Sequence, residues 1–307
     1  MEKGFSLSIT LQNVNVRTIY KFSFRVASHV LDSHPETALN RSMEQIIELS
    51  GYPINTKVEG EGPPVLLLHS YWGSLLLFDE MAGELSKTRK VIRIDLPGHG
   101  NSATPPPGYR FDSFAVVLNE LLQRLNIAGK ISIIGHSMGG YVAMAFAERF
   151  PERMESLILM HSPVRRADDQ SIKSRNREAD LLRKGKKELL LQVTVPSNFA
   201  SGQDGNMAKT LAMVMQTSKQ VTLDGALRSI EAMNHRNNYL KFLQNQTFPV
   251  FIIVGKHDKV YDAEGQLEDG FKIPCAEILF LEHSGHMGFL EESIKVLSRL
   301  KQFLDQI

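Results

Sequence analysis

The chain has 307 residues, of which 42% are hydrophobic and 22% charged, as is typical of a globular domain with a sizeable core. Its 35 basic and 34 acidic residues leave a net charge of +1, which excludes the basic field of a nucleic-acid-binding protein and any strong attraction to anionic membranes. The single cysteine, Cys275, excludes an internal disulfide framework and favours a reducing compartment.

Hydropathy gives no reason to expect a membrane span or an export signal. No run approaches the roughly 18 to 20 apolar residues that cross a bilayer. The first residues alternate polar and apolar side chains and lack the continuous apolar stretch of a secretory signal. We therefore expect a cytoplasmic protein.

Residues 1–43 stand apart from the regular pattern that follows. On a helical wheel their apolar residues share a broad arc, and Arg17, Lys21 and Arg25 form a basic stripe on the other side. The pattern predicts an amphipathic helix that packs on the protein's own core or on a second copy. Contact with a membrane surface is the alternative interpretation.

From about residue 44 the sequence alternates strands with helices. A hairpin is predicted over 46–58, and a turn signal rich in glycine and proline follows it. Buried strands are predicted over 65–69, 90–95, 130–135, 154–162, 248–255 and 276–282. Helices are predicted over 75–87, 114–127, 141–150 and 293–307. This alternation predicts an α/β fold with a doubly wound, mostly parallel sheet.

One interval is too long for a structureless loop. Residues 165–245 separate two strands by about eighty residues and have helix-compatible sequence. We therefore predict a helical cap over 165–245 inserted into a core of residues 44–164 and 246–307. Six apolar cap residues are candidates to line a pocket, although packing within the cap is the favoured role for any single one: Leu189, Leu190, Val193, Phe199, Leu211 and Met215.

The stretch "IIGHSMGGYVAM" places Ser137 between Gly135 and Gly139, after an apolar run and before a helical one. A strand that turns sharply into a helix needs neighbours without side chains, and the residue at the apex then presents its hydroxyl outward. This is the mechanics of the G-x-S-x-G nucleophile elbow. The alternative is an incidental serine in a glycine-rich turn. The presence elsewhere in the chain of a base and an acid that could activate Ser137 decides between the two interpretations.

A serine hydroxyl needs a base, and the base needs an orienting acid. Asp258 follows the strand predicted over 248–255, and His286 follows the next strand. Both loops belong at the carboxyl edge, where parallel sheets build their sites. The neighbouring competitors are His257, Asp262 and His283. His283 and His286 have metal-ligand spacing, but no cysteine or carboxylate cluster completes such a site, so we expect no metal.

Five stretches together resemble the α/β-hydrolase family, in its branch with an inserted helical cap: "VLLLHSYWG", "IDLPGHGNS", "GHSMGG", "VGKHD" and "SGHMGFLEE". The resemblance covers nearly all of the chain from about residue 44. It implies that Ser137 is the nucleophile, that His286 is the general base and then the acid, and that Asp258 orients His286.

The same resemblance implies an oxyanion hole formed by the backbone N–H groups of Met138 and Tyr71. The family usually has His-Gly where this chain has His69 and Ser70. The freedom of that glycine is missing, and the Ser70 hydroxyl either adds a donor or caps the following turn. Ser70 and Trp72 are candidate substrate-binding residues.

These features predict a serine hydrolase that cleaves a carboxylic ester of a small or medium-sized substrate through an acyl-enzyme, without a cofactor. A thioesterase or acyl-carrier esterase with a basic cap is the second prediction, and a non-enzymatic ligand receptor on the same fold is the third. Apart from the substrate, the expected partner is a second copy of the chain, or a membrane surface, bound through residues 1–43.

Overall fold

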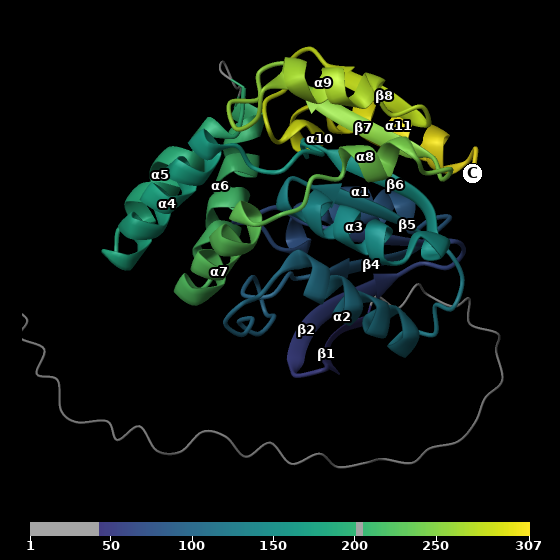
Figure 1. Cartoon of the computed structure of the whole chain (residues 1–307), viewed down its shortest axis with the longest axis horizontal. Helices are drawn as coiled ribbons and strands as arrows, with labels where there is room; N and C mark the ends of the chain where they lie inside the picture. The colour runs from purple at the N-terminus through teal and green to yellow at the C-terminus, as the bar shows by residue number, and fades with distance from the viewer. Residues whose placement is uncertain (1–42, 201–204) are drawn as a thin grey trace, which may run out of the picture. The chain divides into compact units, whose positions relative to one another are not determined.

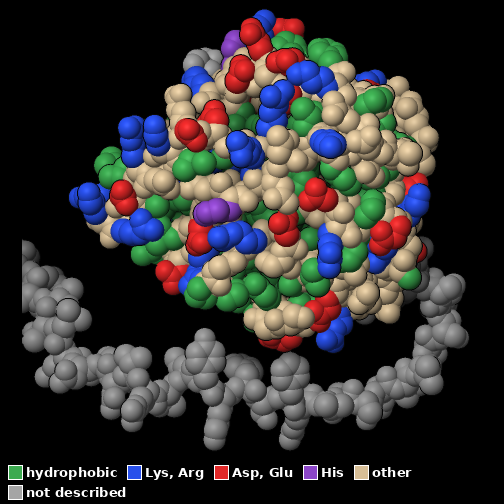
Figure 2. All heavy atoms as spheres, viewed as in Figure 1, with side chains coloured by type: hydrophobic (Ala, Val, Ile, Leu, Met, Phe, Trp, Pro, Cys, Tyr) green, Lys and Arg blue, Asp and Glu red, His purple; other side chains and the backbone are tan. Residues whose placement is uncertain are grey.

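The structure is a computed structural model, and it describes residues 43–200 and 205–307. The predicted amphipathic extension over 1–43 therefore lies outside the described residues, except for Met43. In the part of the chain that is described, no helix is long and apolar enough to cross a membrane. Basic and acidic side chains are interspersed over the face shown in Figure 2.

One sheet of eight strands organises the described chain (Figure 1). Its order is β1-β2-β4-β3-β5-β6-β7-β8. β1 pairs antiparallel with β2, and β2 antiparallel with β4, while all other pairs are parallel. The strands are β1 (Met43–Leu49), β2 (Tyr52–Glu59), β3 (Pro64–Leu68), β4 (Lys90–Ile94), β5 (Ile131–His136), β6 (Met154–Met160), β7 (Val250–Gly255) and β8 (Ala276–Leu281). The predicted doubly wound, mostly parallel sheet is confirmed.

Helices cover this sheet in the expected alternation. The helices of the core are α1 (Asp79–Leu85), α2 (Phe111–Arg124), α3 (Met138–Arg149), α9 (Ala263–Phe271), α10 (Gly288–Glu291) and α11 (Ser293–Leu304), with short 3₁₀ turns at Leu75–Phe78 and Pro151–Arg153. α2 packs against α3, and α1 packs against α11. β5 and β7 are buried along their whole length, as strands with covered faces must be.

Five helices lie between β6 and β7 in the chain. They are α4 (Asp169–Arg183), α5 (Lys187–Ser197), α6 (Gly205–Lys219), α7 (Leu223–Asn234) and α8 (Leu240–Gln244). α4 packs against both α5 and α7, and α5 against α6. In Figure 1, α4 to α7 stand together to the left of the sheet. We call α4 to α8 the inserted helices.

The start of α3 packs closely against the residues at the ends of two strands. A Cβ added to Gly139 would lie 2.0 Å from the carbonyl oxygen of Leu68, at the end of β3. A Cβ added to Gly140 would lie 2.2 Å from Ser162 Oγ. Glycine is therefore required at these positions because the helix begins where two strand ends leave no space for a side chain.

We predict that Gly139→Ala lowers the free energy of unfolding by about 1 to 3 kcal/mol, because the new methyl group overlaps the Leu68 carbonyl. Gly83→Ala is the matched control. Gly83 lies within α1, and its added Cβ meets no atom within 4 Å, so we expect a gain of about 0.5 to 1 kcal/mol there. Urea denaturation measures both, and equal effects would contradict the packing argument.

Candidate active site

Ser137 lies at the turn between β5 and α3, with φ 53° and ψ −113°. A non-glycine residue at positive φ costs on the order of 1 to 3 kcal/mol unless its surroundings hold it there. The Ser137 N–H donates to the Met160 carbonyl oxygen at 2.9 Å. The Ser162 hydroxyl donates to the Ser137 carbonyl oxygen at 3.0 Å. The strained residue is thus held from both sides by the end of β6.

Asp258 and His286 lie on the loops after β7 and β8 and form a hydrogen bond. His286 Nδ1 lies 2.8 Å from Asp258 Oδ2, and since an ionised carboxylate only accepts, Nδ1 carries the proton. Asp258 Oδ1 accepts from the N–H groups of Val260 at 2.8 Å and Tyr261 at 3.1 Å. The buried carboxylate is therefore satisfied, and His286 Nε2 is left as the basic nitrogen.

A second imidazole, that of His161, lies against the same carboxylate. Its Nδ1 is 3.5 Å from Asp258 Oδ2, without forming an aligned hydrogen bond. Gly255 and Gly288 leave room for the His161 ring, because an added Cβ would lie 3.0 Å and 2.7 Å from ring atoms. Burial raises the pKa of Asp258, but His286 and His161 lower it by more, so the pKa lies below its usual value.

His136 fixes the backbone of the His286 loop. Its Nε2 lies 2.8 Å from the His286 carbonyl oxygen and donates to it. Burial holds the pKa of His136 well below its usual value, so the ring stays neutral. The residue before the candidate nucleophile thus positions the loop of the candidate base.

The loop after β3 forms a turn over residues 70–73, closed by a 2.9 Å hydrogen bond from the Gly73 N–H to the Ser70 carbonyl oxygen. Trp72, not Ser70, has positive φ in this turn, at 63°. The absence of glycine at position 70 therefore costs no backbone strain. Within the described chain, no hydrogen bond uses the N–H of Tyr71 or of Met138, so both donors are available to a ligand.

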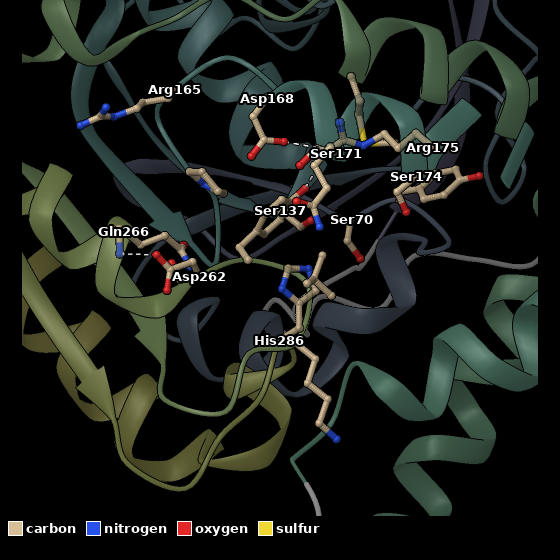
Figure 3. Close-up of a pocket in the computed structure, with 18 of the residues that line it drawn as sticks. Ser70, Ser137, Arg165, Asp168, Ser171, Ser174, Arg175, Asp262, Gln266 and His286 are labelled. Carbon is tan, nitrogen blue, oxygen red and sulfur yellow. Dashed lines mark hydrogen bonds between the residues drawn. The ribbon is translucent and has the colours of Figure 1, made fainter. Parts of the chain in front are cut away.

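These groups share one cavity of about 890 Å³, within the usual range for small-molecule sites. Ser70, Tyr71, Trp72, Ser137 and His286 all line it. In the close-up, Ser137 and Ser70 lie near the centre, with His286 on one side of them and Arg175 and Ser174 of α4 on the other (Figure 3). The cavity is therefore built from both the core and the inserted helices.

A sequence profile described as the alpha/beta hydrolase fold matches residues 63–293. The chain belongs to the α/β hydrolase fold family.

Named members of this family resemble the chain over most of its length. It is 28% identical over 254 residues to a pimeloyl-[acyl-carrier protein] methyl ester esterase of Nitrosomonas europaea, covering 77% of this chain and 94% of the relative. It is 26% identical over 259 residues to Lipase 3 of a Moraxella species, covering 83% and 80%. A thermophilic esterase from Thermogutta terrifontis has the same fold, with TM-score 0.80 and 24% identity over 87% and 98% of the two chains.

In this member of the family, the inserted helices hold the core loops through direct hydrogen bonds. Glu178 of α4 accepts from the Tyr71 hydroxyl at 3.0 Å and from Trp72 Nε1 at 3.2 Å. Burial raises the pKa of Glu178. The His286 N–H donates to the Asn198 carbonyl oxygen, beyond α5, at 2.7 Å. Both the loop after β3 and the loop that carries His286 are thus attached to the insertion.

The competing residues have other places in the structure. Asp262 caps α9, accepting from the N–H groups of Glu264 and Gly265. His257 and His283 are exposed. Gly285 adopts no positive φ. The lack of a side chain at Gly285 instead lets the His286 loop lie directly against the backbone of residues 198–200, since an added Cβ would lie 2.8 Å from that backbone.

For most of the apolar candidates of the inserted helices, the structure favours the packing role over the lining role. None of the six candidates lines the cavity in the described structure; two are exposed and the others pack inward. Those six are Leu189, Leu190, Val193, Phe199, Leu211 and Met215. α5 presents Thr194 and Ser197 to the cavity instead. Helical spacing identified apolar residues but not which face of α5 the fold turns inward.

Sequence reasoning also missed His161, Glu178, Arg175 and Tyr261. For His161 a signal existed, because it directly follows β6, which lies between the strands of the nucleophile and the acid. For Glu178, Arg175 and Tyr261 there was none, since their partners come from distant parts of the chain.

A metal could be held only at the expense of the hydrogen bond between Asp258 and His286. Ligand atoms of His161, Asp258 and His286 lie within 4.8 Å of one another. However, Asp258 Oδ2 already accepts from His286 Nδ1, and metal ligation by that nitrogen would require its proton to leave. Of His283 and His286, whose metal-ligand spacing was noted in the sequence, only His286 belongs to this cluster, and His283 is exposed.

We predict that stability falls between pH 7 and pH 5 because four buried histidines stay neutral when folded. Burial lowers the pKa of His69 to about 4 and that of His99 to about 3, and also lowers those of His136 and His161. For His69 and His99, the unfolded chain takes up a proton near pH 6.5 that the folded chain does not, so stability decreases as pH falls, by roughly 2 kcal/mol for each of the two. The lowered pKa values of His136 and His161 act in the same direction.

The contribution of one histidine is measured by urea denaturation of His99→Asn at pH 7 and pH 5. The variant should lose about 2 kcal/mol less than the wild type between the two pH values. His283→Asn, at an exposed position, serves as the control and should lose as much as the wild type. An unchanged loss in His99→Asn would show that His99 is not held neutral.

Proposed function

We propose that this protein is a serine hydrolase that cleaves carboxylic esters through an acyl-enzyme. The observation that carries the proposal is the hydrogen bond between Asp258 and His286, together with the cavity that His286 lines with a strained Ser137. A family with esterase and lipase members supports it. In this proposal, the inserted helices form the cap over the site.

In the first half of the reaction, Ser137 Oγ attacks the ester carbonyl carbon while His286 Nε2 accepts its proton. The carbonyl oxygen becomes an oxyanion, which the unused N–H groups of Met138 and Tyr71 stabilise. The carbon–oxygen bond to the alcohol then breaks, and His286 returns the proton to the departing alcohol. An acyl group remains on Ser137.

In the second half, water takes the place of the alcohol. His286 accepts a proton from water as the oxygen attacks the acyl carbon, and the bond to Ser137 breaks as the proton returns to Oγ. Asp258 stays ionised throughout and stabilises the imidazolium that forms in each half. Its lowered pKa suits this role, because the carboxylate keeps its charge near neutral pH.

We expect Ser137→Ala to fold normally and to lose ester hydrolysis by several orders of magnitude, up to about 10⁶-fold, because no other hydroxyl is activated. The measurement is the initial rate on a panel of p-nitrophenyl esters, with mass spectrometry of protein treated with a fluorophosphonate probe. The adduct should map to Ser137. Ser174→Ala, which changes a serine of the same cavity, should still be labelled at Ser137. An adduct elsewhere contradicts the assignment.

Asp258→Asn should lower kcat by about 10⁴-fold with KM near its original value, because asparagine presents the wrong partner to His286 Nδ1. Asp262→Asn is the matched control on the same loop. Asparagine caps a helix about as well as aspartate, so stability should change little, and kcat should change by less than tenfold. The reverse pattern of kcat would assign the acid to Asp262.

A thioesterase or acyl-carrier esterase is the second candidate. The observation that favours it is the exposed basic turn between α4 and α5, which includes Lys184 and Lys186, and the relative from Nitrosomonas europaea is named for an acyl-carrier substrate. A carrier would approach this turn by charge attraction. The double variant Lys184→Glu with Lys186→Glu should then lower kcat/KM for an acyl-carrier ester and leave that for a small p-nitrophenyl ester unchanged.

A further inference from the structure

The cavity is more polar and more charged than a site for a simple alkyl ester needs to be. Five cationic and five carboxylate side chains line it. The cations are Arg165, Arg166, Arg175, Arg236 and Lys259, and the carboxylates are Asp168, Glu178, Asp262, Glu268 and Asp269. A buried charge pays a desolvation cost unless it has a partner. The ion pairs and hydrogen bonds of these ten side chains therefore indicate which of them could bind a charged substrate.

Each of the five carboxylates already has a partner. Asp269 pairs with Arg165, and Glu268 with Lys272 at 2.6 Å. Asp168 and Asp262 accept from backbone N–H groups as caps of α4 and α9. Glu178 accepts from Tyr71 and Trp72. All five therefore use oxygens in hydrogen bonds or ion pairs, but only Asp269 forms an ion pair with a cation of the lining.

Three of the five cations, Arg166, Arg175 and Arg236, have no carboxylate partner in the described chain. Arg166 is exposed, and Arg236 donates to the Arg165 and Met233 carbonyl oxygens at 3.1 Å. Arg175 is therefore left as the half-buried cation with only long hydrogen bonds.

Within the described chain, no carboxylate oxygen lies within 4.0 Å of the Arg175 guanidinium. Its hydrogen bonds are two long ones, of 3.4 Å each, to Asn234 Oδ1 and to the Tyr261 hydroxyl. A guanidinium has five N–H donors, so most of the donors of Arg175 remain for a ligand. Figure 3 shows this side chain among the residues that surround the cavity.

Tyr261 connects Arg175 to the catalytic centre. The Tyr261 ring stands edge-on to the His286 ring, with centroids 5.5 Å apart, while its hydroxyl contacts Arg175. Tyr261 thus spans the space between His286 and Arg175. A substrate whose reacting carbonyl lies at Ser137, beside His286, needs only to extend past this one side chain to contact Arg175. The guanidinium is within reach of the far end of a short chain, and not of the reacting ester.

We infer that Arg175 binds a free carboxylate at the far end of the substrate, so that the preferred substrates are esters carrying one carboxylate, such as half-esters of short dicarboxylic acids or esters of hydroxy acids. This inference rests on the proposed ester hydrolysis. A carboxylate matches the planar guanidinium through two parallel hydrogen bonds. The balanced charge of the lining favours a singly charged group over a phosphate dianion.

The test compares probes that differ only in a terminal group. Monomethyl adipate and methyl hexanoate place the carboxylate or its methyl replacement on the acyl side, and 6-acetoxyhexanoate and hexyl acetate place it on the alcohol side. We expect kcat/KM to be at least tenfold higher for the charged member of one pair, and Arg175→Gln to lower that ratio by at least tenfold. Arg177→Gln, at an exposed position on the same helix, should leave the ratio unchanged.

The ratio separates binding of the charge from a structural role of Arg175. If Arg175 only positions Tyr261, the variant lowers both members of a pair equally, and the inference is overturned. It is overturned too if the wild type hydrolyses p-nitrophenyl esters but prefers neither charged probe, and the proposed function then stands. If no ester is hydrolysed and Ser137 is not labelled, both proposals fail. Competitive inhibition by adipate but not by hexanoate, weakened in Arg175→Gln, supports the inference independently.

Discussion

The close approach of α3 to the ends of β3 and β6 is the constraint on which the rest of the site depends. Gly139 and Gly140 allow the helix to begin against the Leu68 carbonyl and Ser162. This contact forces Ser137 to positive φ and leaves the Met138 N–H at the start of a helix, where the helix itself offers no acceptor. One packing contact thus produces both the strained residue and one of the two free donors beside it.

The histidine side of the site depends on neutral buried rings. His136 donates to the His286 carbonyl oxygen, and His161 lies between Gly255 and Gly288 against Asp258. Because burial lowers the pKa of both rings, neither brings a second positive charge next to His286. Asp258 can therefore stabilise charge on His286 alone, which is the condition for a general base in this position.

The sequence predicted the sheet and the meeting of Asp258 with His286 because both follow from local pattern and chain order. Buried strands have continuous apolar runs, and residues after parallel strands meet at one edge. The cavity lining was not predictable in this way. Thr194 faces the cavity and Leu190 does not because α5 packs against α4 and α6, and no spacing within α5 records which of its neighbours it meets.

The hydrogen bonds that Tyr71 and Trp72 donate to Glu178 limit how this protein can change over evolution. The Ser218 hydroxyl also donates to the Trp72 carbonyl oxygen at 2.8 Å, and the Asn198 carbonyl oxygen accepts from the His286 N–H. The helices that would select a substrate in the proposed reaction thus also supply hydrogen-bond partners to the loop after β3 and to the loop that carries His286. Recombination that exchanged residues 165–245 for those of another family member would have to restore these bonds, so new specificities are more readily reached here by single substitutions along α4 than by transplanting the whole insertion.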